Sequence, residues 1–382
     1  MKSRLKTISS ILVGGLFVFW FARQLDWVEV WGEVGKASWH QLGMALSLLI
    51  GTYFVRVLRW RALLAPLADC SFGSLFRATV VGYSALFILG RAGELIVRPA
   101  VLSVKDRVHP SASYATVMIE RVFDMVMVVL FFAVNLVFFE YIPRDAEAMR
   151  LYGWIKGIGA LLLAVAMAGV YGLSLFQRRR AGALAYLDRR TGRLPRPLGR
   201  ALMSLLRHIG EGLSVLRDAR GLAATLSCTA LLWLMVALAH LLVVRAFGVP
   251  YEDVPFTGAV FVMGLTMLGS VVPTPGGATG PFHTAAAGAL IFLGVAGAKA
   301  ASVAIILHLV IFAPATLFGL YYMLKDGLSL EGLRRIGERQ VEEVDGTLVA
   351  GSPGQEGDED VAVRVTRRGD ELIKEFAEEG RI

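Results

Sequence analysis

The chain has 382 residues, of which 55% are hydrophobic and only 18% are charged. Soluble domains carry about a quarter charged residues, so this composition is typical of a polytopic membrane protein and argues against a soluble enzyme. A formal net charge of +8 would suggest a nucleic-acid partner in a soluble protein. Here the basic residues lie between apolar segments, and the positive-inside rule explains them with no nucleic acid involved.

The N-terminus carries three basic residues before an apolar run from Ile8 to Ala22. This pattern resembles a signal peptide, but no small-residue cleavage site follows and further hydrophobic segments do. We therefore expect an uncleaved first span.

Five further segments reach or approach the roughly 20 apolar residues that a span needs. They are Ser38 to Val55, Ser111 to Phe139, Gly157 to Phe176, Leu222 to Val244, and Ala300 to Leu324. Two other stretches do not fit a single pass. Ala78 to Gly90 has only 13 residues, which is typical of a re-entrant or interfacial segment. Phe256 to Ala298 runs for 43 residues without Asp, Glu, Lys or Arg. The latter could cross twice or form a re-entrant pair broken in the middle.

The sequence thus predicts an all-α, polytopic transmembrane helical bundle with about six full spans and two broken or re-entrant helical elements. Discontinuous helices that enter from opposite faces are a recurring transporter architecture, with the substrate site between them.

Charge predicts the topology. Eleven Arg lie between Arg178 and Arg220 against three acidic residues, which indicates a cytoplasmic loop, whereas Glu252 and Asp253 indicate the outside. The uncharged stretch must return to the side it left, so we expect a multi-pass protein of the cell inner membrane with N- and C-termini cytoplasmic. Residues 1–325 form the transmembrane domain, and residues 326–382 are predicted to be a polar, mostly disordered cytoplasmic tail.

The first charged cluster lies between Gly90 and Pro99. On a helix, Arg91, Glu94 and Arg98 share one face, because they are spaced i, i+3 and i+7. An ion-pair stripe with surplus positive charge suits an anionic headgroup such as a phosphate. The alternative is that the arginines extend to the membrane surface and fix topology, but the flanking glycines and proline would make a poor anchor.

The second cluster consists of Glu120, Arg121 and Asp124. These residues lie two to three turns into an apolar segment, so they need charged partners, and Arg91 or Arg98 is a natural one. Two interpretations stay open: a structural ion-pair network without ligand, or carboxylates that position the basic residues for a ligand.

The third cluster is a break in the long uncharged stretch. Three prolines and three glycines between positions 273 and 281 cannot sustain a helix. Unpaired backbone groups at membrane depth are tolerated only against protein or a water-filled cavity, and a half-helix beginning at Pro281 would attract an anion. The alternative is an extracellular turn between two spans. The candidate substrate-binding residues here are Pro273, Pro275, Gly276, Gly277 and His283.

A basic, aromatic helix end contains Arg56, Arg59, Trp60 and Arg61. This pattern favours an interfacial anchor, although Arg59 is also a candidate for substrate binding.

Metal and cofactor chemistry is not predicted. His240, His283 and His308 lie at apolar positions, where single histidines more often form a hydrogen bond than bind a metal. Cys70 and Cys228 are far apart and indicate neither a disulfide framework nor a metal site. The sequence has no nucleophile motif, phosphate-binding loop or acidic metal-binding pair, so we expect no catalytic residues and no cofactor.

Four motifs in order resemble the lysylphosphatidylglycerol synthase transmembrane-domain family, also described as flippase-like integral membrane proteins. They are Arg59-Trp60-Arg61-Ala62-Leu63-Leu64, Gly90-Arg91-Ala92-Gly93-Glu94 with Arg98, Glu120-Arg121 with Asp124, and the Pro-Thr-Pro-Gly-Gly element beginning at Pro273. The resemblance covers residues 10 to 325. It implies a membrane domain with re-entrant helices that moves lipids or lipid-linked intermediates between leaflets. His283 departs from the family, in which many members place a Glu.

We therefore expect a lipid translocase-like protein, not an enzyme, whose partner is a phospholipid or lipid-linked substrate. In this interpretation Arg91 and Arg98 bind the phosphate, Glu94, Glu120 and Asp124 orient them, and the break lines the path. Two alternatives stay open: a membrane transferase or accessory subunit acting on polyprenyl-phosphate-linked glycans, and a structural partner of a separate lipid synthase. A membrane enzyme partner or a homo-oligomer is compatible with each.

Overall fold

The computed structural model describes residues 27–65, 67–89, 91–106, 110–139, 219–248, 254–272 and 274–326, together with isolated positions at 23, 108 and within 149–168. The described part contains ten numbered helices and no strand. The all-α prediction is therefore confirmed for this part of the chain.

Four helices are long and apolar enough to cross a membrane. They are α3 (Trp39–Leu64), α6 (Pro110–Phe138), α10 (Ala219–Arg245) and α14 (Gly297–Lys325). The shortest, α3, has 26 residues and is about 39 Å long, more than the roughly 30 Å hydrocarbon core. The expected span 8–22 lies outside the described residues and 157–176 lies mostly outside them, so the total of six stays a prediction.

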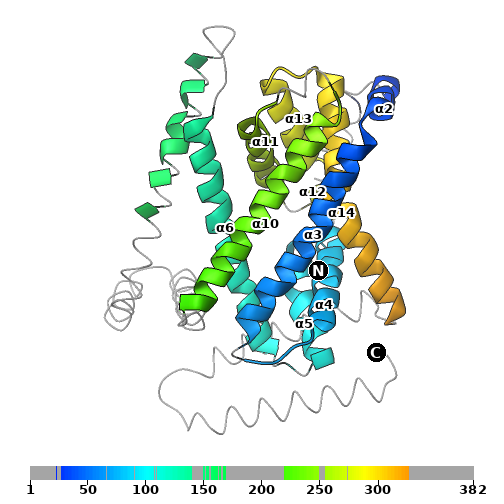
Figure 1. The fold of residues 1–382 in the computed structure, drawn as a ribbon. Helices are drawn as coiled ribbons and strands as arrows, with labels where there is room; N and C mark the ends of the chain where they lie inside the picture. The colour runs from blue at the N-terminus through cyan, green and yellow to red at the C-terminus, as the bar shows by residue number, and fades with distance from the viewer. Residues whose placement is uncertain are drawn as a thin grey trace, which may run out of the picture.

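The α4–α5 hairpin corresponds to the short stretch after the second segment. Helix α4 (Phe72–Leu89) is followed directly by α5 (Arg91–Asp106), which packs along it. The chain therefore leaves on the side where it entered, as expected for a re-entrant element (Figure 1). Helix α4 begins six residues before Ala78, where the uncharged stretch starts, so it includes Arg77. The charge of Arg77 is paired with Asp326 at 2.9 Å.

The α11–α13 hairpin occupies the 43-residue uncharged stretch. Helices α11 (Phe256–Gly269) and α13 (Pro281–Phe292) have 14 and 12 residues, about 21 and 18 Å, too short for a full crossing. The short α12 (Pro275–Ala278) lies between them. Of the two alternatives, the structure therefore agrees with the broken re-entrant pair.

The two hairpins enter the bundle from opposite ends and meet inside it. Figure 1 shows α4 and α5 in the lower half, α11 and α13 in the upper half, and α12 between them. Helix α12 contacts α4, and Phe87 at the end of α4 is 4.0 Å from the position that a Cβ on Gly276 would take. The sequence predicted such elements entering from opposite faces, with the substrate site between them.

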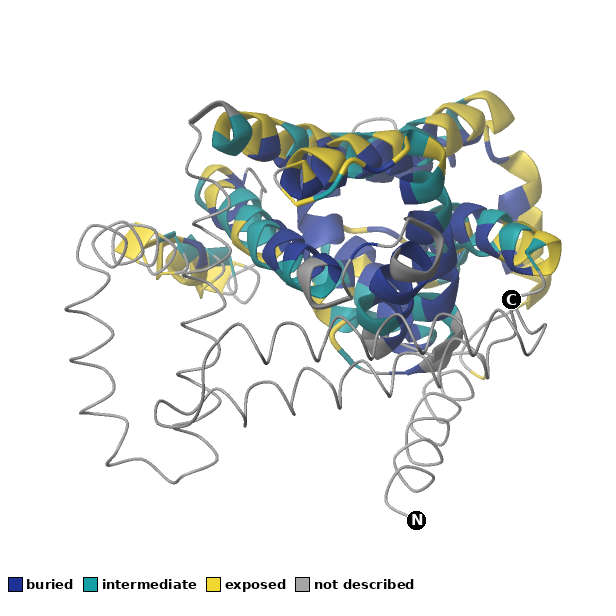
Figure 2. Ribbon diagram, turned by 90° about the horizontal axis from the view of Figure 1, so that it is seen from below, coloured by how far each residue is buried: buried dark blue, intermediate teal, exposed yellow. Residues whose placement is uncertain are grey.

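Buried and exposed positions divide as a bilayer requires. Buried residues face the interior of the bundle and exposed ones face its periphery (Figure 2). Large apolar side chains such as Phe54, Leu58 and Phe138 are exposed on membrane-length helices. Hydrocarbon contact accounts for this exposure, because lipid tails are as apolar as these side chains. Helix α2 (Trp27–Lys36) precedes α3 and packs on α14.

Candidate functional site

Arg59 lies at the centre of a buried charged network. Its guanidinium donates to Asp124 at 2.6 and 3.2 Å, to Glu120 at 3.3 Å and to the Thr229 hydroxyl at 3.0 Å. Its side chain is fully buried, as is Trp60. The interpretation of this helix end as an interfacial anchor is therefore wrong for these two residues: helix α3 continues past Val55 with its charged face turned inward.

Arg98 joins the α4–α5 hairpin to α6. It donates to Glu120 at 2.5 Å, and its guanidinium carbon lies 3.9 Å from the centre of the Trp60 ring. Glu94 is one turn away on the same helix at 3.8 Å. A Cβ on Gly82 would lie 2.8 Å from the Arg98 Cβ, so glycine allows α4 to approach α5 this closely. The expected shared face of Glu94 and Arg98 is present, and it faces the protein interior.

Arg121 and Arg56 form the accessible edge of the network. Arg121 contacts Glu94 and Asp124, both at 3.2 Å, and donates to the Tyr83 hydroxyl at 3.3 Å. Its side chain is 30% exposed, whereas that of Arg56 is 11% exposed. Arg56 lies over the Tyr83 ring at 5.0 Å and approaches Asp124 only to 3.8 Å.

Positive charge exceeds negative charge in this network. Among the described residues it holds four guanidiniums and three carboxylates, a surplus of one: Arg56, Arg59, Arg98 and Arg121 against Glu94, Glu120 and Asp124. The buried Nε of Arg56, Nη2 of Arg98 and Nε of Arg121 have no hydrogen-bond partner. Buried charges usually saturate their hydrogen bonds, so open donors beside a surplus cation are suited to an anion.

Most of the first two sequence clusters meet here. The structure brings Glu94, Arg98, Glu120, Arg121 and Asp124 together with Arg59. Arg91 begins α5, but its side chain lies outside the described residues.

The sequence interpretation missed three members of the network. Tyr83 lies on α4, and Thr229 and Trp233 on α10, where the Trp233 Nε1 donates to Asp124 at 3.3 Å. A polar stripe on α10 could have revealed two of them, because Thr225, Thr229 and Trp233 recur every four residues in an apolar helix. Tyr83 has no comparable pattern.

The break between α11 and α13 is a left-handed turn. Gly276, Gly277 and Ala278 have φ of 71°, 67° and 65°, and Gly280 has φ of 94°. Glycine accepts such angles without strain, and the turn agrees with the prediction that the glycines interrupt the helix here. Pro275 begins α12, and Pro273 lies outside the described residues.

His283 and His308 face each other beside this turn. The His283 Nδ1 accepts the Gly280 N–H at 3.2 Å, and the His308 Nε2 lies 3.3 Å from the Gly277 carbonyl oxygen. His240 is separate and bonds to the Val236 carbonyl at 2.8 Å. Within the described ranges no group of three or more metal-ligating side chains occurs.

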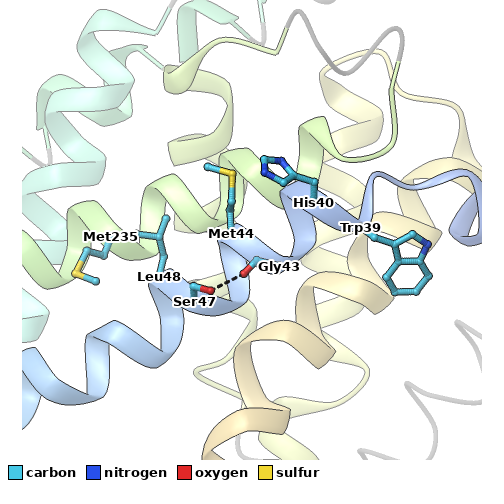
Figure 3. A pocket seen from close by; sticks show the side chains of 7 residues that line it. All are labelled: Trp39, His40, Gly43, Met44, Ser47, Leu48 and Met235. Atoms are coloured by element: carbon cyan, nitrogen blue, oxygen red, sulfur yellow. Dashed lines mark hydrogen bonds between the residues drawn. The ribbon is translucent and has the colours of Figure 1, made fainter.

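An apolar groove of about 650 Å³ lies between α3 and α10, away from the charges (Figure 3). Ser47 in its wall donates to the Gly43 carbonyl of its own helix at 2.8 Å. The groove therefore offers a headgroup little polar contact, and we place the candidate site at the arginine network instead.

Comparison with known proteins identifies the family. A search of curated proteins finds no relative that matches the chain. The family model described as "Lysylphosphatidylglycerol synthase TM region" matches residues 7–319, more than half of the chain. With its membrane-length apolar helices, the chain is an integral membrane protein that belongs to the lysylphosphatidylglycerol synthase TM region family.

Proposed function

We propose that the protein moves an anionic lipid or lipid-linked intermediate between membrane leaflets and has no catalytic activity of its own. The observation that carries this proposal is the surplus guanidinium charge with open N–H donors. Buried ionisable groups in a membrane protein usually mark a substrate or ion path.

The accessible residues receive the headgroup. Arg121 and Arg56 are the partly exposed arginines of the network, and Tyr83 lies between them. A phosphate oxygen can accept from a guanidinium, and a bidentate contact adds both strength and orientation.

The fully buried residues position the site. Arg59 and Arg98 have no exposed side-chain surface, and their carboxylate partners fix them in place. Glu94 and Asp124 each form an ion pair with Arg121 at 3.2 Å. In the proposed mechanism a lipid phosphate competes with these carboxylates and replaces part of their contact with Arg121. This differs from the expectation that Arg98 contacts the lipid directly.

The meeting of the two hairpins supports a path across the bundle. Helix α12 contacts α4, so each hairpin can line the half of the path on its own side of the bundle. Helices that are interrupted near the bilayer midplane are typical of transporters that work by alternating access.

Translocation in proteoliposomes tests the proposal. Fluorescent phosphatidylglycerol and phosphatidylcholine are reconstituted with the full chain, and a membrane-impermeant quencher reports the outer-leaflet fraction over time. We expect the protein to expose inner-leaflet phosphatidylglycerol to the quencher. In Arg121→Gln this translocation should be slower. The control is Arg61→Gln, because Arg61 lies outside the network with its side chain 54% exposed.

Rates equal to those of protein-free vesicles for every anionic lipid tested would refute the proposal. Metal-dependent turnover of a lipid-linked sugar would favour the transferase instead. Full activity after charge reversal at Arg121 and Asp124 would favour a structural partner of a synthase.

A further inference from the structure

A small apolar pocket lies between the end of α4 and the middle of α14. Its volume is about 180 Å³. Figure 1 shows α14 passing beside α13 in the upper half of the bundle and beside α4 in the lower half, and it packs on both helices. We call this cavity the α4–α14 pocket. The side chains that line it include Phe87, Leu309, Phe312, Ala313, Thr316 and Leu317.

The α4–α14 pocket lies at the depth of the hydrocarbon core. Leu309 and Leu317 are about 18 and 30 Å from the start of α14, a helix about 43 Å long. This is the middle part of a helix that exceeds the roughly 30 Å hydrocarbon thickness. Leu309 and Leu317 are 50% and 66% exposed, so the pocket is open at the lipid-facing surface. Lipid chains therefore reach it more readily than water does.

The walls of the pocket suit a hydrocarbon chain. Its two polar side chains are engaged by backbone carbonyls: Thr316 donates to Phe312 at 2.8 Å, and the Nε2 of His308 lies 3.3 Å from the Gly277 oxygen. The remaining lining residues are apolar. A headgroup would find little polar contact here, whereas a chain would bury apolar surface.

The pocket adjoins the hairpin junction, the place where α12 contacts α4. Phe87 is 4.0 Å from the position that a Cβ on Gly276 would take, and Phe312 is 2.7 Å from that of a Cβ on Gly277. Two rings of the pocket wall therefore lie against the left-handed turn. In the proposed path, a lipid headgroup must pass this junction to reach the half that the other hairpin lines.

The pocket is also close to the accessible edge of the arginine network. Tyr83 precedes Phe87 by four residues on the same face of α4, about 6 Å along the axis. The Tyr83 hydroxyl accepts from Arg121 at 3.3 Å. Ser84 donates to the Thr316 carbonyl at 2.9 Å, which fixes α14 against α4 at this height. A phosphate at Arg121 and a chain in the pocket would thus lie beside neighbouring turns of one helix.

We propose that the α4–α14 pocket binds one hydrocarbon chain of the lipid whose phosphate contacts Arg121. This inference rests on the proposed function and assigns a site to the part of the lipid that the arginine network does not bind. The chain stays in the hydrocarbon while the headgroup passes the hairpin junction, because a charged path would deprive the chain of its apolar contacts. A free phosphate lacks this second contact.

The larger groove between α3 and α10 is a comparison surface. It is also apolar and lies on a membrane-length helix, with Met44 in its wall 45% exposed. Leu48, the lining residue on α3 nearest in sequence to Arg56, precedes it by eight residues, about 12 Å along the axis. Lipid that merely surrounds the protein should enter both cavities, whereas a lipid bound at Arg121 should favour the α4–α14 pocket.

Photolabelling tests the pocket independently of translocation. The full chain in nanodiscs is irradiated with phosphatidylglycerol that carries a diazirine in the middle of one chain, and labelled residues are mapped by mass spectrometry. We expect more label at positions 309–317 than at Met44. Ala313→Phe, which fills the pocket, should lower this labelling, and Leu320→Phe, at a 38% exposed position of α14 outside the pocket, should not. Ala313→Leu repeats the test with a smaller side chain if phenylalanine disturbs folding.

The same experiment distinguishes the occupants. Arg121→Gln should also lower the labelling of the pocket, because one lipid contacts both places. Labelling that is equal in the pocket and the groove and insensitive to Ala313→Phe would mean surrounding lipid only and would overturn the site. Pocket labelling that persists in Arg121→Gln would assign the chain to a different lipid and would overturn the proposal too. Efficient disulfide cross-linking between copies of Leu317→Cys would place a second copy there instead.

The proteoliposome assay tests the role of the pocket in translocation. Ala313→Phe should lower the phosphatidylglycerol rate about tenfold, while Leu320→Phe should leave it unchanged. A natural rate in Ala313→Phe, with the pocket label lost, would overturn the role of the pocket alone. Absence of translocation by the natural protein would overturn the proposed function, whereas photolabelling would still decide whether the pocket binds a chain.

Discussion

Arg98 on α5 and Glu120 on α6 form a fully buried ion pair at 2.5 Å, and Glu120 also accepts from Arg59 on α3 at 3.3 Å. One carboxylate therefore joins three helices. Its partners come from the re-entrant hairpin and from a membrane-length helix, so the charges hold the hairpin in place as well as forming a site.

Glu120→Gln should destabilise the protein strongly. The amide cannot neutralise Arg59 and Arg98, and removing one member of a buried pair costs about 3–5 kcal/mol because the remaining charge is left uncompensated. Thermal unfolding in detergent measures the effect. Asp69→Asn is the control, since the Asp69 side chain is 98% exposed and its ion pair is 3.9 Å long. Equal unfolding temperatures for the two variants would contradict a joining role for Glu120.

Arg121→Lys should impair lipid translocation more than Arg61→Lys. Arginine reaches Glu94, Asp124 and Tyr83 at once, whereas a lysine ammonium is a single point charge without the planar fork. We expect at least a tenfold lower rate, which corresponds to about 1.4 kcal/mol. The proteoliposome assay measures it, and a rate like that of the natural protein would exclude a bidentate headgroup contact at Arg121.

The sequence revealed which positions carry charges, but not which of these side chains face the protein interior. Charges inside apolar segments are costly, so Glu120 and Asp124 predicted partners, and the pairing of Glu120 with Arg98 follows that expectation. Arg59 was misassigned because a basic residue beside Trp at a helix end has the composition of an interfacial anchor. Only the packing of α3 against α6 and α10 distinguishes the two cases.

The break between α11 and α13 was predicted because its cause is local. The length of α4 was not predicted. Proline and glycine interrupt a helix wherever they occur together, so the turn at 273–280 required no tertiary information. Arg77 marked the end of the uncharged stretch in the sequence, but it lies inside α4, over the Tyr322 ring at 5.1 Å and paired with Asp326. Partners about 250 residues away in the chain leave no periodic pattern in the sequence.

Gly277→Ala should disturb the hairpin junction. The position has φ of 67°, and a Cβ there would lie 2.7 Å from the Phe312 ring. The left-handed conformation alone costs an L-residue about 1–2 kcal/mol, and the overlap adds to it. Reactivity of a cysteine introduced at Thr279 should rise in this background, measured with a small polar thiol reagent.

Gly288→Ala is the matched control for this change. Gly288 lies within α13, and a Cβ there would meet no atom within 4 Å. We expect unchanged reactivity at position 279 and a slightly higher helix stability, because alanine favours helix over glycine. Identical behaviour of Gly277→Ala and Gly288→Ala would show that the turn tolerates a side chain and is not a tightly packed junction.

Acid should weaken the attachment of α2 to α14 through Glu33. The hydrogen bond from Lys36 at 2.9 Å, and then the charge of Lys299 at 3.7 Å, hold the pKa of Glu33 below its usual value of 4.5 in spite of burial. A folded-state pKa below the unfolded one means that Glu33 stabilises the fold above about pH 4.5 and that this contribution is lost as pH falls through the lowered pKa.

Glu33→Gln should therefore be less stable than the natural protein at neutral pH and indistinguishable from it in strong acid. Unfolding midpoints across pH measure this, with Glu29→Gln, at an exposed position on the same helix, as the control. A stability difference that persists unchanged into strong acid would show that Glu33 acts through packing and not through its charge.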